Sequence, residues 1–526
     1  MTLRTFRDMA TFRYVFFLFV LTVILRFPAL LVPVIDTDEA GHGVCARELL
    51  RGGTLYVDYA DNKPPLLYWL YTGIHWLGNK SNLAVHWFTV IWILIGACGL
   101  WNMVFAVTGG SDNGRWAAAA YVVGSSVYLP NDMLASNGEQ LMNPFLIIAV
   151  WALWLRGPTF IRGLVSGIAA CAGGLCYQKG WIVIPLIVIW VIYDQMIRKR
   201  KFTPGFSFVS GHILGVLSLA MVVSAILLST GSLAEGVRWN FISNSRYIQT
   251  GVGLLSFSLE DSQPHGTIRI VFYALANFLP FWVIWSGLRK KEFHNADIRH
   301  FQHFLIAWFA VSFMALSLGG RYYGHYFLQI VPSWCALFGL YMPSALRRFS
   351  GKNQRKLVYA GIPLMALLLF SYIWLAIGGL ESQKPILKDV AHHARINTDP
   401  GDRIFVWGYA SPVYYYSDRQ PASRFVYPQS LAGYVPGNPY SMNQTTDFHP
   451  FIAWENWPLL IEDLSRNKPS CIYDFAPTGF HYWGKFVMSA YPIGSFVSRF
   501  YEPCDTIRGV VAYKPKDGSF DIRYDD

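Results

Sequence analysis

The sequence predicts a polytopic α-helical membrane protein that carries a C-terminal soluble α/β domain. Three observations support this prediction. The composition is strongly apolar, long apolar runs recur through residues 1–380, and residues 381–526 instead alternate short β-rich runs with helical stretches. Of the 526 residues, 53% are hydrophobic and only 14% are charged, whereas soluble proteins contain about 25% charged residues. This composition excludes a disordered or fibrous chain and argues against an ordinary soluble enzyme.

The apolar runs predict the number of membrane spans. A helix needs roughly 17–25 predominantly apolar residues to cross the hydrocarbon core. Such runs lie at residues 14–34, 83–107, 115–130, 140–155, 162–178, 180–197, 207–230, 267–288, 301–318, 325–346 and 357–380. We therefore expect about eleven transmembrane helices, within a range of eleven to thirteen, in a membrane domain that covers residues 1–380.

The basic residues predict the orientation of these spans. Residues 1–380 have a net charge of +13 and residues 381–526 a net charge of −2. One basic cluster precedes the first apolar run, at residues 4–13, and the others lie between runs, at residues 156–162, 198–201, 289–291 and 347–356. Eleven spans and a cytoplasmic N-terminus put every cluster on the cytoplasmic side, as the positive-inside rule requires. Because the basic residues follow the pattern that orients membrane spans and no nucleic-acid motif occurs, nucleic acid is not an expected partner.

The same count places the C-terminal region outside the inner membrane, in the periplasm if the cell is Gram-negative and otherwise outside the cell. Its β-rich runs at residues 403–409, 424–427, 470–475 and 509–513 alternate with helical stretches at residues 385–396 and 456–467, which is typical of an α/β domain. Cys471 and Cys504 both lie in this domain, where an oxidising compartment permits a disulfide between them. The seven cysteines show no spacing typical of zinc ligands.

Three carboxylates lie where the first span ends, at Asp36, Asp38 and Glu39. The simplest interpretation is that Thr37 or Asp38 caps the next helix, which the glycines at 52–53 then terminate. A cap does not account for three acids at a membrane boundary, where charged groups are costly unless they face a hydrated cavity. One of these carboxylates is therefore a candidate general base for an acceptor hydroxyl or amine.

The same outer loop, residues 36–82, contains a second motif. The sequence Asp61-Asn62-Lys63-Pro64-Pro65 holds Lys63 at a rigid junction, because the prolines fix an extended entry to the next helix. Lys63 either extends to the membrane interface or binds a phosphate as a point charge. Spacing alone does not separate these two interpretations.

A third motif, Gly319-Gly320-Arg321-Tyr322-Tyr323-Gly324-His325-Tyr326, lies between two later spans. An aromatic belt with an interfacial arginine is one explanation. The alternative is a site for an anionic lipid headgroup, because the glycines of this short turn allow a ligand to approach the backbone closely. Under that alternative the candidate residues are Arg321, Tyr322, Tyr323 and His325.

Other polar residues at the predicted outer face are candidates as well. Glu139 begins a span, Lys179 lies between two spans, and Arg246 lies in the outer loop 231–266. Arg26 lies within the first span, where an unpaired charge is costly. Each of these residues either serves a site or acts as a helix cap, an interfacial side chain or a member of an internal ion pair.

The order of these motifs resembles that of a known family. An acidic pair after the first span, a Leu-Tyr-x-Asp segment and then Lys-Pro-Pro-Leu-Leu-Tyr are similar to the GT-C glycosyltransferases, and more narrowly to bacterial members of the protein O-mannosyltransferase superfamily, which includes the lipid A aminoarabinose transferases. The segment at 319–326 is similar to a motif of bacterial homologues. The resemblance covers most of residues 10–345. Asn62 stands where the aminoarabinose enzymes have an acid, so the donor sugar is not specified.

The resemblance implies a GT-C fold and a membrane glycosyltransferase that moves a sugar from a polyprenyl-phosphate donor, usually with inversion. The acceptor is then a lipid, a glycan or a protein, and membrane lipids surround the enzyme. Asp38 is implied as the base, with Asp36 as the alternative and Glu39 as an orienting group. The implied phosphate-binding residues are Lys63, Arg321, His325 and Arg246. Some GT-C enzymes require a divalent metal, which the three acids would accommodate, but no metal ligand is assigned here.

Three other classes of protein compete with this interpretation. A lipid or glycan transporter is disfavoured by the absence of an inverted repeat in the sequence. A glycan polymerase or ligase that uses a pyrophosphate donor needs the same cations, so the sequence does not separate it from the first interpretation. A sensor whose outer domain binds a ligand predicts no turnover.

Overall fold

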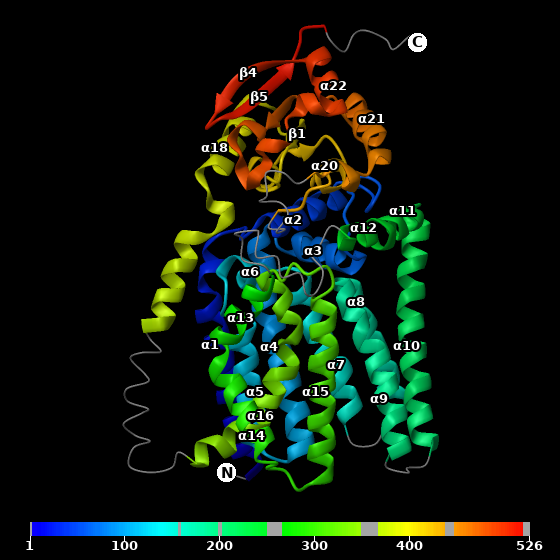
Figure 1. Cartoon of the computed structure of the whole chain (residues 1–526), viewed down its shortest axis with the longest axis vertical. Helices are drawn as coiled ribbons and strands as arrows, with labels where there is room; N and C mark the ends of the chain where they lie inside the picture. Colours follow the sequence, from blue (N-terminus) through cyan, green and yellow to red (C-terminus); the bar gives the residue numbers. More distant parts are fainter. Residues whose placement is uncertain are drawn as a thin grey trace.

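The computed structural model describes residues 3–155, 159–197, 202–249, 266–348, 367–436 and 447–518. Long helices stand side by side in one bundle, with a sheet domain above one end of it and the N-terminus at the other (Figure 1). The bundle contains α1 (Leu3–Leu31), α4 (Asn82–Thr108), α5 (Ser111–Gly124), α7 (Gly138–Trp154), α8 (Phe160–Cys176), α9 (Val183–Ile197), α10 (Phe202–Ser229), α13 (Gly266–Ala276), α14 (Phe278–Arg289), α15 (Ala296–Leu316) and α16 (Val331–Arg348).

The expected number of spans is corrected by the structure. Every predicted span coincides with helical structure, including residues 367–379. Among the described residues, however, only four helices are long and apolar enough to cross a membrane, or five if the pair α13 and α14, bent by 79°, is one span. The other helices are shorter, such as α5 with 14 residues and α7 and α8 with 17 each, or carry more polar residues.

A layer of short helices separates the bundle from the sheet domain (Figure 1). It includes α2 (Thr37–Leu50), α3 (Pro65–Leu77), α6 (Pro130–Leu134), α11 (Leu233–Val237) and α12 (Asn244–Gln249). The sequence explains the limits of the first two. Asp36 caps α2, which ends at Leu50 before Gly52, whose φ of 94° favours glycine. Pro64 is the N-cap of α3 and Pro65 its first residue, as predicted.

The C-terminal domain is built on one sheet. Within the described residues its strands are β1 (Arg403–Trp407), β2 (Gln420–Pro421), β3 (Cys471–Asp474), β4 (Tyr501–Ile507) and β5 (Val510–Pro515), in the order β2-β1-β3-β5-β4. The first three strands are parallel, and β5 and β4 continue the sheet as an antiparallel pair. The helices are α18 (Pro385–Asn397), α19 (Pro412–Ser417), α20 (Gln429–Ala432), α21 (Trp457–Asn467) and α22 (Pro492–Phe500).

Most of the predicted elements of this domain are found, with one error. The predicted strand at residues 424–427 is irregular, because its backbone groups bond elsewhere. The Arg424 amide donates to the Asp463 carboxylate (3.0 Å), and the Arg424 carbonyl accepts from the Ala60 amide of the membrane part (2.9 Å). This segment therefore connects the two parts of the chain instead of extending the sheet. The strand β4 was not predicted.

Cys471 and Cys504 are free cysteines in the structure. Cys471 is buried in β3, and Cys504 lies at the irregular register of β4, with β5 between these two strands. The Cys504 thiol donates to the Ala512 carbonyl oxygen across the β4–β5 pair (3.4 Å). The disulfide that the sequence permits is therefore not formed in the structure.

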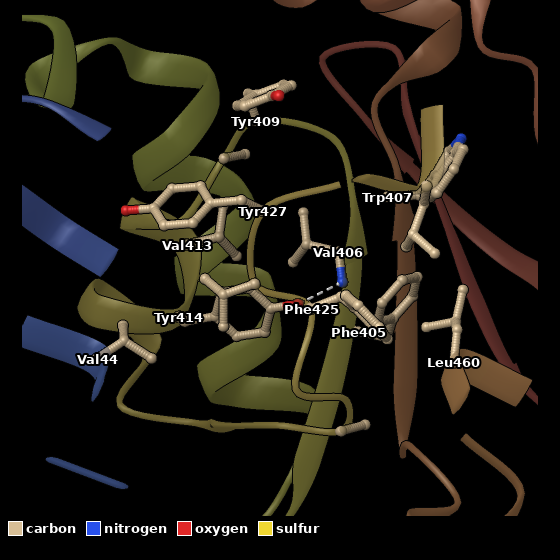
Figure 2. Close-up of a cluster of buried hydrophobic side chains, with 14 of the residues drawn as sticks. Val44, Phe405, Val406, Trp407, Tyr409, Val413, Tyr414, Phe425, Tyr427 and Leu460 are labelled. Atoms are coloured by element: carbon tan, nitrogen blue, oxygen red, sulfur yellow. Dashed lines mark hydrogen bonds between the residues drawn. The ribbon is translucent and has the colours of Figure 1, made fainter. Parts of the chain in front are cut away.

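The sheet domain and the short-helix layer share one hydrophobic core. Figure 2 shows Val406 and Trp407 of β1, Tyr414 of α19 and Val44 of α2 within the same cluster of buried side chains. The Val406 amide donates to the Tyr414 hydroxyl (2.8 Å), which satisfies the buried polar end of that tyrosine. Because α2 contributes to the core of the domain, the position of the domain over the bundle is fixed.

The Gly41→Ala substitution tests this docking. A Cβ atom at Gly41 would lie 1.8 Å from the hydroxyl of the buried Tyr427, so the ring has to move. We expect a loss of stability of about 1–3 kcal/mol, as for other overpacked sites, and a lower melting temperature of the full chain in detergent. Gly73→Ala in α3 is the control, because a Cβ there meets nothing within 4 Å. Equal stability of the two variants would contradict this account of the docking.

Candidate active site

A cavity of about 330 Å³ lies between the short-helix layer and the sheet domain. Both parts of the chain contribute to its walls. The residues that line it are Asp36, Thr37, Asp38, Asp61, Asn62, Lys63, Asn131, Asp132, Arg269, Tyr323, His325, Tyr326, Tyr409, Tyr427, Gln429, Val435, Pro436 and His481. The structure thus brings together Asp36, Asp38, Lys63, Tyr323 and His325 of the predicted candidates, from three separate stretches of sequence.

The three acids in and before the first turn of α2 lie in different surroundings. Asp36 is the N-cap, since its Oδ1 accepts from the Glu39 amide (2.8 Å), and its Oδ2 accepts from the Asn137 side chain (3.1 Å). The expected cap at Thr37 or Asp38 is therefore wrong by one or two residues. Asp38 is left to face the cavity, and its side chain is 44% exposed.

Glu39 is completely buried and does not line the cavity. Its two oxygens accept from the amides of Ile35 (2.7 Å) and Ser136 (2.9 Å), and from the His86 Nε2 of α4 (2.8 Å). Burial opposes ionisation, but His86 and the amide donors outweigh it and hold the pKa of Glu39 below its usual value. Glu39 therefore joins α2 to α4 and to the segment before α7.

Asp38 and Lys63 form an ion pair at the cavity surface, with 3.8 Å between Oδ2 and Nζ. Burial opposes ionisation of Asp38, but the charge of Lys63 prevails and lowers the pKa of Asp38 below its usual value. Asp38 is therefore a carboxylate at neutral pH. Lys63 reaches this position because Pro64 and Pro65 turn the chain into α3, as the sequence predicts.

His325 lies between two carboxylates. Its Nδ1 is 2.7 Å from Asp132 Oδ1, its backbone amide donates to the same oxygen (3.1 Å), and its Nε2 is 4.0 Å from Glu139 Oε1. Burial alone would lower the pKa of His325, but the carboxylates of Glu139, Asp132 and Asp38 together raise it to about 9. His325 is therefore a fixed cation in the cavity wall at neutral pH.

Asp61 is a second buried carboxylate of the cavity. The Tyr68 hydroxyl donates to its Oδ2 (2.5 Å), and the Asn62 amide donates to its Oδ1 (2.6 Å). Burial raises the pKa of Asp61 even though Lys63 is near. No pattern in the sequence distinguishes Asp61 from the adjacent residues.

The cationic side of the cavity also contains Arg269 of α13, which the sequence did not identify. Its guanidinium lies 5.5 Å from the Tyr323 ring centre and donates to the Arg321 carbonyl oxygen (2.8 Å). Arg321 and Tyr322 are themselves buried and do not line the cavity. A single arginine at the outer end of an apolar run is the signal that would have identified Arg269.

The remaining candidates lie behind the cavity or outside the described side chains. Glu139 is buried behind His325, and Lys179 lies 3.4 Å from the ring centre of Tyr326. Arg246 belongs to α12, but its side chain lies outside the described residues. Arg26 binds the carbonyl oxygens of Met133 (3.0 Å) and Leu134 (2.6 Å), which explains a buried charge within α1.

Metal ligation is not supported by the donor set. Within the part of the chain that the structure describes, no three His, Cys, Asp or Glu side chains are grouped so that they could hold a metal ion. The cavity carboxylates of Asp38 and Asp132 are each engaged by a cation, Lys63 and His325 respectively. Binding of the divalent ion that the resemblance allows stays a prediction.

No protein-family model matches the chain. Among curated proteins the chain is similar to the undecaprenyl phosphate-alpha-4-amino-4-deoxy-L-arabinose arabinosyl transferase 2 of Proteus mirabilis (strain HI4320), with 24% identity over 333 residues. This match covers 60% of the chain and 57% of the transferase, so the chain spans less than two thirds of its relative.

Two solved structures share the fold. ArnT from Cupriavidus metallidurans bound to undecaprenyl phosphate matches with a TM-score of 0.62 and 11% identity, over 96% of this chain and 98% of that one. The archaeal oligosaccharyltransferase AglB from Archaeoglobus fulgidus, in complex with an inhibitory peptide and a dolichol-phosphate, matches with a TM-score of 0.55 and 11% identity, over 99% and 75%. The expected resemblance to the GT-C enzymes is therefore confirmed.

Glu39→Gln and Asp38→Asn are expected to differ in stability. Replacing a buried carboxylate that accepts from three donors leaves donors unsatisfied and costs about 1–3 kcal/mol for each lost bond, whereas an exposed ion pair contributes about 0–1 kcal/mol. We therefore expect Glu39→Gln to lower the melting temperature strongly and Asp38→Asn to change it little. Thermal unfolding of the two purified variants measures this difference. A larger loss in Asp38→Asn would reverse the roles assigned to the two acids.

Proposed function

We propose that the protein is a membrane glycosyltransferase that transfers a sugar from a polyprenyl-phosphate-linked donor to an acceptor on the outer face of the inner membrane. The observation that carries this proposal is the cavity itself, in which the ionised Asp38 lies near Lys63 and near the fixed cation His325. The related transferase is named for an undecaprenyl phosphate donor, and the two structures with the same fold hold undecaprenyl phosphate and dolichol-phosphate.

The proposed reaction needs a base and a site for a departing phosphate. Asp38 accepts the proton of the acceptor hydroxyl or amine as that group attacks the anomeric carbon. The bond between this carbon and the phosphate oxygen breaks. The configuration at the anomeric carbon is inverted, because the acceptor attacks from the face opposite the leaving phosphate. The lipid phosphate leaves with its negative charge, which Lys63, Arg269 and His325 stabilise.

The other candidates are assigned supporting roles. Asp36 is the alternative base, since it also lines the cavity, and Glu39 positions the turn that carries both acids. Arg321 orients Arg269 through its carbonyl, while Glu139 acts on the charge of His325. Tyr322, Tyr323 and Lys179 support the same wall, and Arg246 remains a candidate phosphate ligand.

We propose a topology that agrees with this site. The N-terminus is cytoplasmic, residues 1–380 form the catalytic membrane domain, and residues 381–526 are periplasmic. Two features support this arrangement: α1 begins at the end of the bundle opposite the sheet domain (Figure 1), and the cavity lies at the domain end. A lipid carrier in the bilayer would then bring its phosphate to the level of the cavity.

Asp38→Asn tests the proposed base. Loss of a general base reduces the rate by about 10²–10⁴-fold, so we expect a loss of that order in sugar release from a radiolabelled polyprenyl-phosphate donor pool by the purified protein. Asp112→Asn is the matched control, because Asp112 is exposed in α5, forms an ion pair with Arg115 (3.5 Å) and does not line the cavity. Full activity of Asp38→Asn would transfer the assignment to Asp36.

The pH dependence of donor turnover tests whether protonated His325 stabilises the phosphate. The pKa of His325 is raised to about 9, so its charge is present at neutral pH and is lost as the pH rises through 9. We expect donor turnover to fall over this range. Asp132→Asn removes a carboxylate that raises this pKa, so the alkaline limb should move to lower pH. An alkaline limb that is the same in both proteins would exclude His325 as the phosphate-binding cation.

A further inference from the structure

The cavity has two chemically different walls. The membrane-domain wall carries the ionisable groups, namely Asp36, Asp38, Asp61, Lys63, Asp132, Arg269 and His325. The opposite wall, called the domain wall below, consists of Tyr409, Tyr427, Gln429, Val435, Pro436 and His481 of the C-terminal domain. None of these six described lining residues is Lys, Arg, Asp or Glu. The proposed function uses the membrane-domain wall and leaves the domain wall without a role.

The domain wall offers aromatic faces and neutral hydrogen-bonding groups. The Tyr409 hydroxyl donates to the Tyr434 carbonyl oxygen (2.5 Å), and Tyr409 contributes aromatic surface to the cavity. The amide of Gln429 and the imidazole of His481 supply donors and acceptors. Binding sites that combine aromatic surface with a few placed polar groups suit a neutral ligand that has both C–H faces and hydroxyls.

The charge of the membrane-domain wall argues against an anionic acceptor. Four carboxylates line the cavity against three cationic side chains, and two of those cations are already paired, Lys63 with Asp38 and His325 with Asp132. The departing lipid phosphate would occupy the same cations. A second anion at the domain wall would then face uncompensated carboxylates, which is unfavourable in a partly buried site.

The backbone at His481 is held in a conformation that side chains rarely adopt. His481 and Tyr482 have φ values of 53° and 61°, in the left-handed region. The Tyr434 hydroxyl donates to the His481 carbonyl oxygen (2.5 Å), which holds this conformation, and His481 lines the cavity. Strained residues persist where the surrounding structure enforces them, and they concentrate at ligand sites.

Hydrogen bonds join the domain wall to the turn of α2 that carries the proposed base. The Tyr427 hydroxyl donates to the carbonyl oxygens of Thr37 (3.1 Å) and Asp38 (3.0 Å), and the Ser411 hydroxyl donates to Thr37 as well (2.5 Å). A ligand on the domain wall therefore shares the cavity with the Asp38 carboxylate. An acceptor placed there presents its hydroxyl to the base.

We propose that the domain wall is the acceptor subsite and that the acceptor is a neutral sugar hydroxyl, with His481 and Gln429 as its specificity-determining residues. This inference rests on the glycosyltransferase function proposed above. In the step it describes, the acceptor oxygen forms a bond to the anomeric carbon, the bond from that carbon to the phosphate oxygen breaks, Asp38 takes the hydroxyl proton, and the lipid phosphate leaves.

The test uses the full chain in lipid nanodiscs with a radiolabelled polyprenyl-phosphate sugar pool. Three acceptors are compared: neutral disaccharides, the same disaccharides with a phosphate monoester, and a serine-containing peptide. We expect the neutral disaccharides to be the best acceptors. His481→Ala and Gln429→Ala should each raise KM for them at least tenfold, while binding of labelled polyprenyl phosphate stays within twofold of the wild type.

Two further variants separate a specific contact from a structural effect. His481→Asn keeps a hydrogen-bonding side chain and tolerates the left-handed backbone, so it should recover part of the lost affinity. His392→Ala, at an exposed histidine of α18, is the control and should leave KM unchanged. Unchanged KM in both alanine variants, or a preference for the phosphorylated disaccharides, would overturn the neutral-acceptor proposal while the transferase stands. A wild type that neither binds polyprenyl phosphate nor turns over any donor would overturn both proposals.

Discussion

The buried carboxylate of Glu39 is the constraint on which the rest of the site depends. It joins the start of α2 to His86 of α4 and to the Ser136 amide, so the turn that carries Asp36 and Asp38 is attached to the helix bundle at two points, while the Ile35 amide closes the turn itself. A charge in this position is tolerated only because each oxygen has a donor. The interaction converts a short polar segment at a membrane boundary into a rigid support for the cavity.

The same turn of α2 also receives the C-terminal domain. The carbonyl oxygens of its first residues accept from Tyr427 and Ser411, while Val44, farther along the helix, enters the core of the domain. One helix of 14 residues is therefore held from both sides. The site consequently does not belong to either part of the chain alone, and movement of the domain would change the cavity directly.

The sequence was most informative where local chemistry determines structure. Apolar runs gave the helices of the bundle, the Pro64-Pro65 pair gave the position of Lys63, and the acidic cluster after the first span led to Asp38. It failed where a role depends on contacts between distant segments. His325 becomes a cation because of Glu139 and Asp132, the latter 193 positions away. His481 has no local pattern that distinguishes it from other residues of the C-terminal domain. The number of spans was overestimated because apolar runs also form helices that are short, bent or covered by neighbours.

The contrast between Asp38 and Asp61 shows how the cavity separates two carboxylates that both lie near Lys63. Burial dominates at Asp61 and raises its pKa, whereas at Asp38 the neighbouring positive charges prevail and lower the pKa. The Tyr68 hydroxyl and the Asn62 amide hold Asp61 in place, while Asp38 keeps 44% of its side-chain surface exposed. A base has to be both ionised and accessible to the group that loses a proton. Of the two, only Asp38 meets both requirements. Different environments thus give two neighbouring carboxylates different roles in one cavity.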